Sequence, residues 1–145
     1  MITIKQIPSR ETFPVRHPVL RPGKPIEACV FDGDDDKTTV HFGLYEDDIL
    51  AAVTSVFKAE HPHIKGGTQL QLRGMAVLEN HQKKGFGEQL IVSAEDYARR
   101  CGAEILWFNA REIAVKFYER NGYIIENGPF AIGSIGPHYL MFKHL

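Results

Sequence analysis

Hydrophobic and polar positions alternate over much of the first half of the chain, which is the pattern of β-strands. Residues 2–7 alternate and stop at Pro8, and two β-rich runs, 38–46 and 49–57, stand on either side of a polar pair of aspartates. Alternation of this kind predicts half-buried strands. Two such runs around a two-residue polar break predict a hairpin, and residues 68–78 predict one more strand.

Residues 9–30 interrupt this pattern with four prolines. Proline lacks the backbone N–H and restricts the residue before it, so a long regular helix is excluded here. We expect an irregular segment with one or two short helical turns.

The period changes to that of a helix after the stretch GFG at residues 85–87. The apolar residues that follow fall on one helical face; they are Leu90, Ile91, Ala94, Tyr97, Ala98 and Cys101. Gly102 suits the position after the last helical turn. The apolar run at 104–108 predicts a strand that is buried on both faces.

A second helix is expected after this strand. Asn109 can cap it, Glu112 completes a capping box, and Gly122 ends it. Its inward face is expected to hold Ile113, Ala114, Phe117 and Tyr118.

The C-terminal part is expected to contain a strand at 123–126, a glycine- and proline-rich loop at 127–138 and a strand at 139–143. The whole order is then several strands followed by β-α-β-α-β-β. This order predicts an α/β (α+β) fold in which helices pack on one mixed sheet. No repeat or linker divides the chain, so we expect a single domain, residues 1–145.

Composition changes the picture mainly by exclusion. The net charge is −1, so no overall field favours nucleic acid or an anionic membrane as a partner. No apolar run approaches the length of a membrane span, and the N-terminus lacks the apolar core of a signal peptide, so a cytoplasmic protein is expected. Cys29 and Cys101 match neither a metal knuckle nor a disulfide framework. Whether the protein forms a homodimer is left open.

The GFG stretch points to anion binding because it stands at a helix start. A helix N-terminus presents unpaired N–H groups and a partial positive charge, and glycines let the backbone approach a bulky phosphate. A P-loop would need Lys-Ser/Thr where Glu88 and Gln89 stand, and a dinucleotide motif would need glycine in place of Leu90. Both motifs fail, which leaves a diphosphate cradle or an ordinary loop.

Two segments together resemble the GCN5-related N-acetyltransferase (GNAT) family. The stretch GMAVLENHQKKGFGEQLIVSAEDYA resembles its acetyl-CoA-binding motif, whose fixed positions are filled by Gln82, Gly85 and Gly87. The stretch NAREIAVKFYERNGY resembles its second signature, a helix with Phe-Tyr followed by Gly and an aromatic residue. The resemblance covers residues 68–125 and implies a mixed, mostly antiparallel sheet with acetyl-CoA as cosubstrate.

The resemblance also implies how the cosubstrate is held. The backbone groups of Met75, Ala76 and Val77 would bind the pantetheine arm like an added strand. Backbone amides of the glycine loop would wrap the pyrophosphate; they belong to Lys83, Lys84, Gly85, Phe86, Gly87 and Glu88. The two lysines either add charge to the phosphates or form a solvated basic pair.

Acetyl transfer from a thioester to an amine requires a neutral amine, a polarised carbonyl and a proton for the departing thiolate. Tyr118 matches the family tyrosine that supplies this proton. A phenol with a pKa of about 10 suits a thiolate of similar basicity. The alternative is an aromatic residue of the core.

The general base is less evident. Relatives place a carboxylate where this chain has Gln71 or Leu106, and neither side chain can take a proton. Deprotonation is then left to water or to His41, His63 or His138. We rank His138 first, because GPHYLMFK is similar to a Pro-His pair near the last strand of some family members.

Three further residues are candidates for binding. Arg111 stands where many relatives have an asparagine that touches the cofactor arm, and the nearest asparagine here is Asn109. Arg21, like Arg16, lies among prolines in a segment expected to reach the acceptor, and arginine suits a carboxylate; solvated surface arginines are the alternative. The acidic run DGDDD lacks the glycine and glutamate of a calcium loop, so no metal is expected.

The sequence thus predicts an acetyl-CoA-dependent N-acetyltransferase that acts on a primary amine of a small molecule or peptide. A non-catalytic acyl-CoA sensor with the same fold is the alternative, and another acyl chain or a hydroxyl acceptor also stays open. The loops without a cofactor motif, 13–30 and 127–138, are expected to bind the acceptor.

Overall fold

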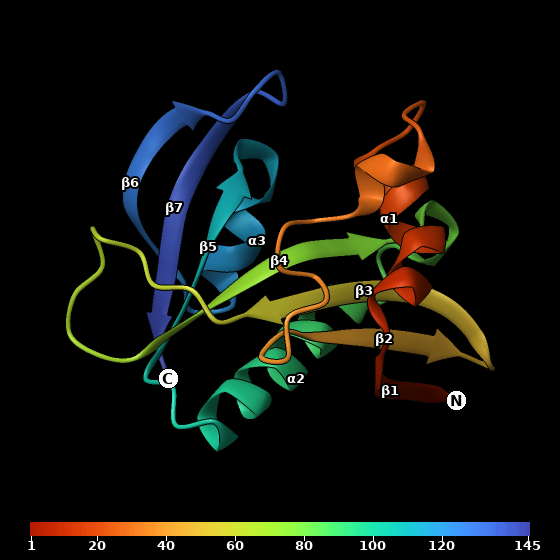
Figure 1. Cartoon of the computed structure of the whole chain (residues 1–145), viewed down its shortest axis with the longest axis horizontal. Coiled ribbons are helices and arrows are strands. Elements are labelled where there is room, and N and C mark those ends of the chain that lie inside the picture. Colours follow the sequence, from red (N-terminus) through yellow and green to blue (C-terminus); the bar gives the residue numbers. More distant parts are fainter.

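One seven-stranded sheet organises the molecule, described over all 145 residues by a computed structural model. The strands are β1 (Ile2–Ile7), β2 (Val40–Glu46), β3 (Ile49–Phe57), β4 (Gln69–Val77), β5 (Ile105–Arg111), β6 (Ile124–Ala131) and β7 (Pro137–His144). They lie in the order β1-β2-β3-β4-β5-β7-β6 (Figure 1), and every neighbouring pair is antiparallel except β4 and β5. The predicted fold class, α/β with a mixed and mostly antiparallel sheet, is confirmed.

Three helices and four short 3-10 turns connect these strands. The helices are α1 (Phe13–Leu20), α2 (Phe86–Arg100) and α3 (Val115–Arg120). The 3-10 turns are η1 (Ser9–Thr12), η2 (Ile26–Cys29), η3 (Glu79–His81) and η4 (Glu112–Ala114).

The hairpin of β2 and β3 turns through two aspartates, as the sequence predicts. Asp47 and Asp48 have φ angles of 49° and 71°, and the flanking residues Glu46 and Ile49 pair with each other. Positive φ at both central residues is typical of the type I′ turn, whose twist matches that of the paired strands.

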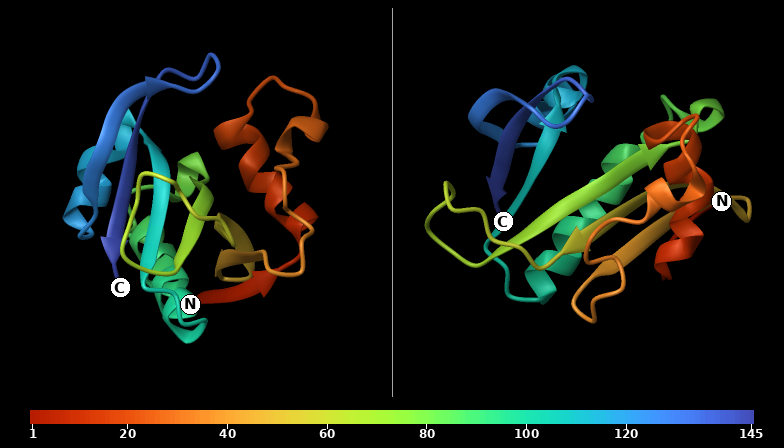
Figure 2. Two further views of the ribbon diagram at one scale, coloured as in Figure 1. Left: turned by 60° about the vertical axis from the view of Figure 1, so that its left-hand side comes forward. Right: turned by 45° about the horizontal axis from the view of Figure 1, so that its top comes forward.

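Helices cover both faces of the sheet. Because successive strand residues point to opposite faces, Ala52 and Val56 of β3 pack in the main core with Leu90 of α2, whereas Val53 packs with Val15 of α1. Figure 2 shows α1 and α2 on opposite sides of the sheet.

The helix after the glycine loop has the end that the sequence predicts. Gly102 has a φ of 80°, and the N–H of Ala103 donates to the carbonyl of Ala98 at 2.9 Å. A left-handed glycine after the last turn lets the chain satisfy the final carbonyls and leave the helix.

The proline-rich segment forms short helical pieces, as expected. Helix α1 has eight residues, with Pro14 in its first turn, where the missing N–H has no intrahelical partner to lose. Arg16 is not a solvated surface arginine, the alternative that the sequence left open for it, because its side chain is fully buried.

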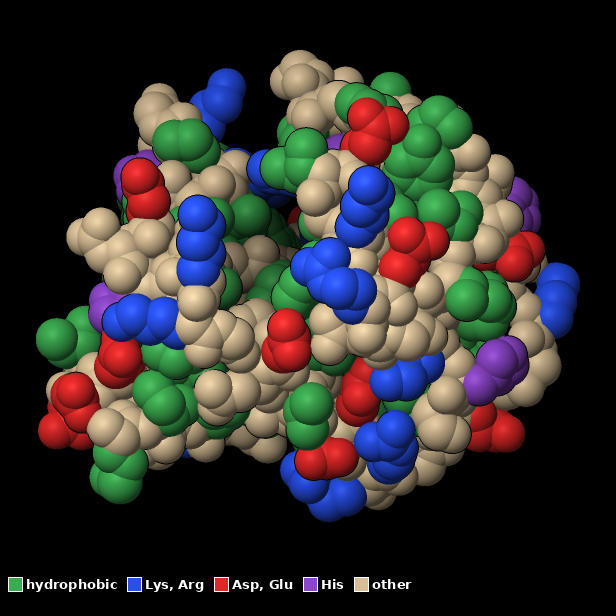
Figure 3. All heavy atoms as spheres, turned by 180° about the vertical axis from the view of Figure 1, so that it is seen from behind, with side chains coloured by type: hydrophobic (Ala, Val, Ile, Leu, Met, Phe, Trp, Pro, Cys, Tyr) green, Lys and Arg blue, Asp and Glu red, His purple; other side chains and the backbone are tan.

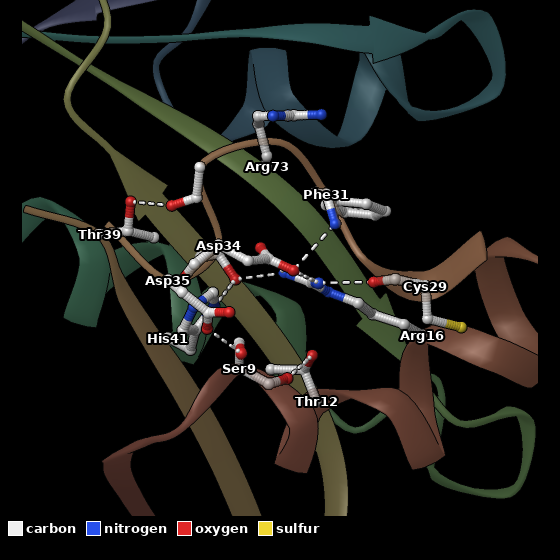
Figure 4. Close-up of polar contacts among 12 residues, drawn as sticks. Ser9, Thr12, Arg16, Cys29, Phe31, Asp34, Asp35, Thr39, His41 and Arg73 are labelled. Atoms are coloured by element: carbon white, nitrogen blue, oxygen red, sulfur yellow. Dashed lines mark hydrogen bonds and ion pairs between the residues drawn. The ribbon is translucent and has the colours of Figure 1, made fainter. Parts of the chain in front are cut away.

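A polar network surrounds Arg16 and joins α1 to the sheet (Figure 4). The guanidinium binds both carboxylate oxygens of Asp34, at 2.7 and 3.1 Å, and donates to the carbonyl of Cys29 at 2.8 Å and to Ser55 Oγ at 3.0 Å. The Ser55 hydroxyl lies 2.6 Å from Nδ1 of His41, whose Nε2 lies 2.8 Å from the Asp34 carbonyl. Since a carbonyl only accepts, Nε2 carries the proton and Nδ1 accepts from Ser55.

Two expectations about the C-terminal half are wrong. Asn109 does not cap a helix, because β5 continues to Arg111 in register with β7 and α3 begins only at Val115. The strand pairing supplies hydrogen bonds for the backbone over residues 109–111, which a helix start would leave unpaired. As a result Ile113, expected to face inward, is 92% exposed.

The expected loop at 127–138 is mostly strand. Residues Phe130 and Ala131 of β6 pair with His138 and Pro137 of β7. Register shifts within β6 absorb the Gly-Pro sequence that suggested a loop. Only residues 132–136 connect the two strands.

Candidate functional site

The sheet opens between β4 and β5. These parallel strands pair only over residues 69–71 and 105–107, and beyond them they diverge (Figure 1). Further along, β4 pairs with β3 alone and β5 with β7 alone. Each strand therefore has an unpaired edge at the opening, on which an extended ligand can add like a strand. Met75, Ala76 and Val77 lie in this part of β4.

A glycine bends β4 at the opening. Gly74 has a φ of 68°, and the register with β3 shifts between Arg73 and Ala76. A Cβ on this residue would lie 3.1 Å from the ring of Phe31 and 3.4 Å from Nε of Arg16. Glycine therefore suits both the backbone conformation and the close approach, and the bulge changes the direction of β4.

A cavity of about 520 Å³ lies at the opening. Its walls come from β4, β5, η4, α3, the end of α1, the segment after η2, and β7 with the connection that precedes it. Figure 3, seen from behind, shows the molecule hollowed between its two halves, with hydrophobic side chains inside the hollow. Tyr118, His138, Arg21, Asn109 and Arg111 all line the cavity, so residues predicted from distant parts of the sequence come together here.

Tyr118 is held by aromatic neighbours. The centroid of its ring lies 4.2 Å from that of Phe108 and 5.2 Å from that of Phe117. The residue is 8% exposed, and burial raises the pKa of the phenol to about 12. At neutral pH the hydroxyl therefore keeps its proton and can donate it toward the cavity that the residue lines.

His138 is fixed in one tautomer. Its Nδ1 lies 2.9 Å from the carbonyl of Gly136, and because a carbonyl only accepts, Nδ1 carries the proton of the neutral ring. Nε2 then holds a free lone pair. The ring stacks on Phe130 at 6.4 Å between centroids, and the residue is 5% exposed. Such a histidine can accept a proton at Nε2.

The other candidates for the base lie apart from Tyr118. Both ring nitrogens of His41 are bound within the buried network of α1, and His63 lies in the connection between β3 and β4. Neither residue lines the cavity, whereas Gln71 does. Leu106 is buried in the main core, and the cavity lining contains no aspartate or glutamate.

The loop before α2 presents a row of free amides. The backbone N–H groups of residues 83–88 donate no hydrogen bond within the protein, and the bond that follows runs from Gln89 to the carbonyl of Gly85 at 3.1 Å. Gly85 has a φ of 79°, and no atom lies within 4 Å of the place where a Cβ would stand. Six free donors around an open glycine at a helix N-terminus fit a diphosphate.

The side chains of this loop have distinct partners. Lys84 Nζ binds the Glu46 carboxylate at 3.0 and 3.3 Å, and His81 Nδ1 lies 2.8 Å from the same group. These contacts, with Lys84 first, lower the pKa of Glu46. Lys83 forms no ion pair, so it is the free cation at the amides. Gln82 donates from its side chain to a carbonyl at the end of β4 at 3.1 Å.

The remaining loop residues contribute to packing as well. Phe86 is buried in the main core, and a Cβ at Gly87 would lie 3.1 Å from the ring of Phe117. Gly87 therefore lets α2 approach α3, a role that the sequence does not indicate. Glu88 is exposed in the first turn of α2.

The structure also reveals a cavity residue that the sequence analysis missed. Arg73 lies on β4 and lines the cavity beside Phe31. Its place as the one charged residue within β4 is the signal that could have identified it.

Two further findings concern other classes of site. No group of three or more His, Cys, Asp or Glu side chains is arranged to hold a metal ion. None of the helices combines the length and apolar character needed to cross a membrane.

Comparisons with known proteins agree with this geometry. The profile of the Acetyltransferase (GNAT) family matches residues 4–123. The uncharacterized N-acetyltransferase YitI of Bacillus subtilis (strain 168) is 32% identical over the whole chain and 97% of its own length. PaiA N-acetyltransferase of Thermoplasma acidophilum, solved in complex with coenzyme A, is 15% identical with a TM-score of 0.68 over 100% of this chain and 99% of its own. A GNAT family acetyltransferase of Elizabethkingia anophelis with acetyl-CoA bound is 14% identical with a TM-score of 0.71 over 99% and 98%.

Proposed function

The chain belongs to the Acetyltransferase (GNAT) family, and from this premise we propose that it transfers the acetyl group of acetyl-CoA directly to a primary amine of a small molecule or peptide. The observation that carries the proposal is one opening in the sheet that combines free amides at residues 83–88, an unpaired β4 edge and a protonated Tyr118. The structures of relatives with coenzyme A or acetyl-CoA bound support it.

The cosubstrate supplies the acetyl group as an activated thioester. Free amides of residues 83–88 hold its diphosphate, and Lys83 adds a positive charge. The backbone of residues 75–77 binds the pantetheine arm by β-augmentation. Asn109 and Arg111, on the facing strand, contact the arm from the other side of the opening.

The chain's own groups then move two protons. Nε2 of His138 takes a proton from the acceptor ammonium, directly or through water, and leaves a neutral amine. The neutral amine attacks the thioester carbonyl, and the hydroxyl of Tyr118 donates its proton to the departing sulfur. The proton that the nitrogen loses as the amide forms restores the Tyr118 hydroxyl, directly or through water. Both residues line the same cavity, so both proton transfers take place there.

One observation favours a second candidate function. The cavity lining contains no aspartate or glutamate, so a carboxylate base is absent and the protein is alternatively a sensor that binds acyl-CoA without turning it over.

A panel of amines, amino acids, polyamines and peptides distinguishes the two functions. Purified protein is incubated with acetyl-CoA and each acceptor, and free CoA is measured with a thiol reagent. Transferase activity predicts thiol release that depends on at least one amine. Binding of acetyl-CoA with no release above the hydrolytic background for any acceptor would establish the sensor instead.

A further inference from the structure

Two arginines with no carboxylate partner meet beside one aromatic ring of the cavity. Arg21 comes from the end of α1 and Arg73 from β4, and both line the cavity. Each guanidinium carbon lies 5.1 Å from the centroid of the Phe31 ring. Segments far apart in the sequence thus bring two positive charges to the same wall.

Neither of these two charges forms an ion pair within the protein. Each group makes one hydrogen bond, to a backbone carbonyl, at 2.9 Å for Arg21 and 3.4 Å for Arg73. Arg16 provides the contrast, because its guanidinium lies 4.0 Å from the same ring and is neutralised by both oxygens of Asp34. In Figure 4 the labelled Arg73 lies apart from that network.

The surroundings of Arg73 favour an added negative charge. Burial is the largest cause that lowers the pKa of the Arg73 guanidinium. The positive charges of Arg16 and Arg21 lower it further, whereas the negative charges of Asp34 and Asp32 raise it. An anion beside the two arginines on the cavity would offset this repulsion. A guanidinium fork matches a planar carboxylate through two parallel N–H···O bonds.

We propose that the acceptor amine carries a carboxylate, which Arg21 and Arg73 bind, an inference that rests on the proposed acetyl transfer at the same cavity. Most residues that line the cavity are hydrophobic, Leu20, Phe31 and Ile135 among them. The carbon skeleton between amine and carboxylate therefore packs on hydrophobic side chains. The acceptor class is an amino acid or a longer amino-carboxylic acid.

Turnover with matched pairs of acceptors tests this substrate class. Each pair consists of an amino acid or ω-amino acid and its carboxamide, from glycine to 6-aminohexanoate, and leucine with leucinamide is included for an apolar skeleton. The ratio of kcat/KM, corrected for the fraction of free amine, is expected to favour at least one acid by about tenfold or more, as a charge-assisted hydrogen bond implies. Turnover in which the acid and the carboxamide of every pair have the same kcat/KM would overturn the proposal and leave the proposed function intact.

Variants assign the effect to the arginines. Arg21→Gln and Arg73→Gln should raise the KM of the preferred acid about tenfold or more and bring the acid-to-amide ratio toward one, with the KM of acetyl-CoA unchanged. Arg73→Lys keeps the charge but removes the fork, and should recover only part of the preference. Arg100→Gln, at the exposed end of α2, is the matched control and should leave both substrates unaffected. If the acid-to-amide ratio were the same in all these variants as in the unchanged protein, the assignment to Arg21 and Arg73 would be contradicted.

Binding gives a readout that does not depend on turnover. With CoA-loaded protein, the acids of the series should shift the NMR resonances of the Arg21 and Arg73 Nε–H groups, and the carboxamides should not. If the acids shift these resonances but no amine releases CoA from acetyl-CoA, the anion site stands and the proposed function fails. If neither acid nor amide shifts them, the carboxylate site is refuted, whatever the turnover shows.

Discussion

At the scale of single residues, the protonation state of Tyr118 determines what the cavity can do. Burial holds the phenol neutral, and the neighbouring ring of Phe108 fixes its place. Tyr118→Phe retains the packing and removes only the proton, so kcat should fall about 10²–10⁴-fold while the affinity for acetyl-CoA stays nearly unchanged. The measurement is steady-state kinetics beside a binding titration. An unchanged kcat, where chemistry limits the rate, would make Tyr118 a core residue only.

The pH profile follows from the same burial. Because the pKa of Tyr118 is raised to about 12, the phenol remains a donor throughout the range in which the protein is assayed. Rising pH deprotonates the acceptor ammonium, so kcat/KM should increase to a plateau and show no decline due to Tyr118 below pH about 10. A descending limb below that pH that disappears in Tyr118→Phe would contradict this account.

At the scale of elements, the glycine loop and α2 form one unit whose two ends can be compared. Gly85 and Gly102 flank the helix with φ angles of 79° and 80°, and neither has an atom within 4 Å of its Cβ position. Asparagine tolerates this region, so Gly85→Asn and Gly102→Asn should both fold with similar small losses of stability. Only Gly85→Asn places a side chain at the free amides.

Acetyl-CoA should separate these two variants. At about 100 times its Kd a ligand adds roughly 2.7 kcal/mol to the free energy of unfolding. Gly102→Asn should gain this stabilisation in full, and Gly85→Asn should lose most of it, as measured by thermal unfolding with and without acetyl-CoA. The same gain in both variants would show that the diphosphate binds elsewhere.

Helix α1 depends on a buried ion pair. The side chains of Arg16 and Asp34 are 0% and 2% exposed, so breaking the pair leaves a buried charge without a partner. Arg16→Met or Asp34→Asn should lower the free energy of unfolding by about 3–5 kcal/mol, and the double variant Arg16→Met with Asp34→Leu by much less than the sum. Urea unfolding measures the free energy of unfolding of the single variants and of the double variant.

An exposed pair provides the comparison for this loss of stability. Arg99 and Asp96 on α2 are about half exposed, and Arg99→Met should change the free energy of unfolding by no more than about 1 kcal/mol. A loss at Arg16 as small as that at Arg99 would show that the buried network is not what holds α1 on the sheet.

At the scale of the whole molecule, local patterns were enough for the elements whose signals are local. Alternation with two aspartates indicated the hairpin, helical spacing indicated α2, and the continuous apolar run at 104–108 indicated a buried strand. The sequence was misleading where pairing with a distant strand decides the structure. Asn109 has the side chain of a helix cap, yet it belongs to β5 because β7 offers it a partner. Gly128 and Pro129 lie within β6 because the residues on either side of them, Asn127 and Phe130, pair with β7.

The cavity shows the same division. Tyr118 and the glycine loop are recognisable from motifs, because each lies within one short segment. Arg16 and Arg21 look alike in the sequence, since both stand among prolines, but Arg16 is buried against Asp34 and Arg21 lines the cavity. Arg73 gave no motif at all. Its place beside Phe31 depends on the bulge of β4, which only the assembled sheet reveals.

The most direct test of the central claim follows a labelled acetyl group through one turnover. The protein is incubated with acetyl-CoA that carries carbon-13 in the acetyl group and with an acceptor from the panel, and mass spectrometry is applied to CoA, acceptor and protein. Direct transfer predicts label on the amine in equal amount to the CoA released, and none on the protein. Release of CoA without labelled amine, or label that stays on a protein side chain, would contradict the account.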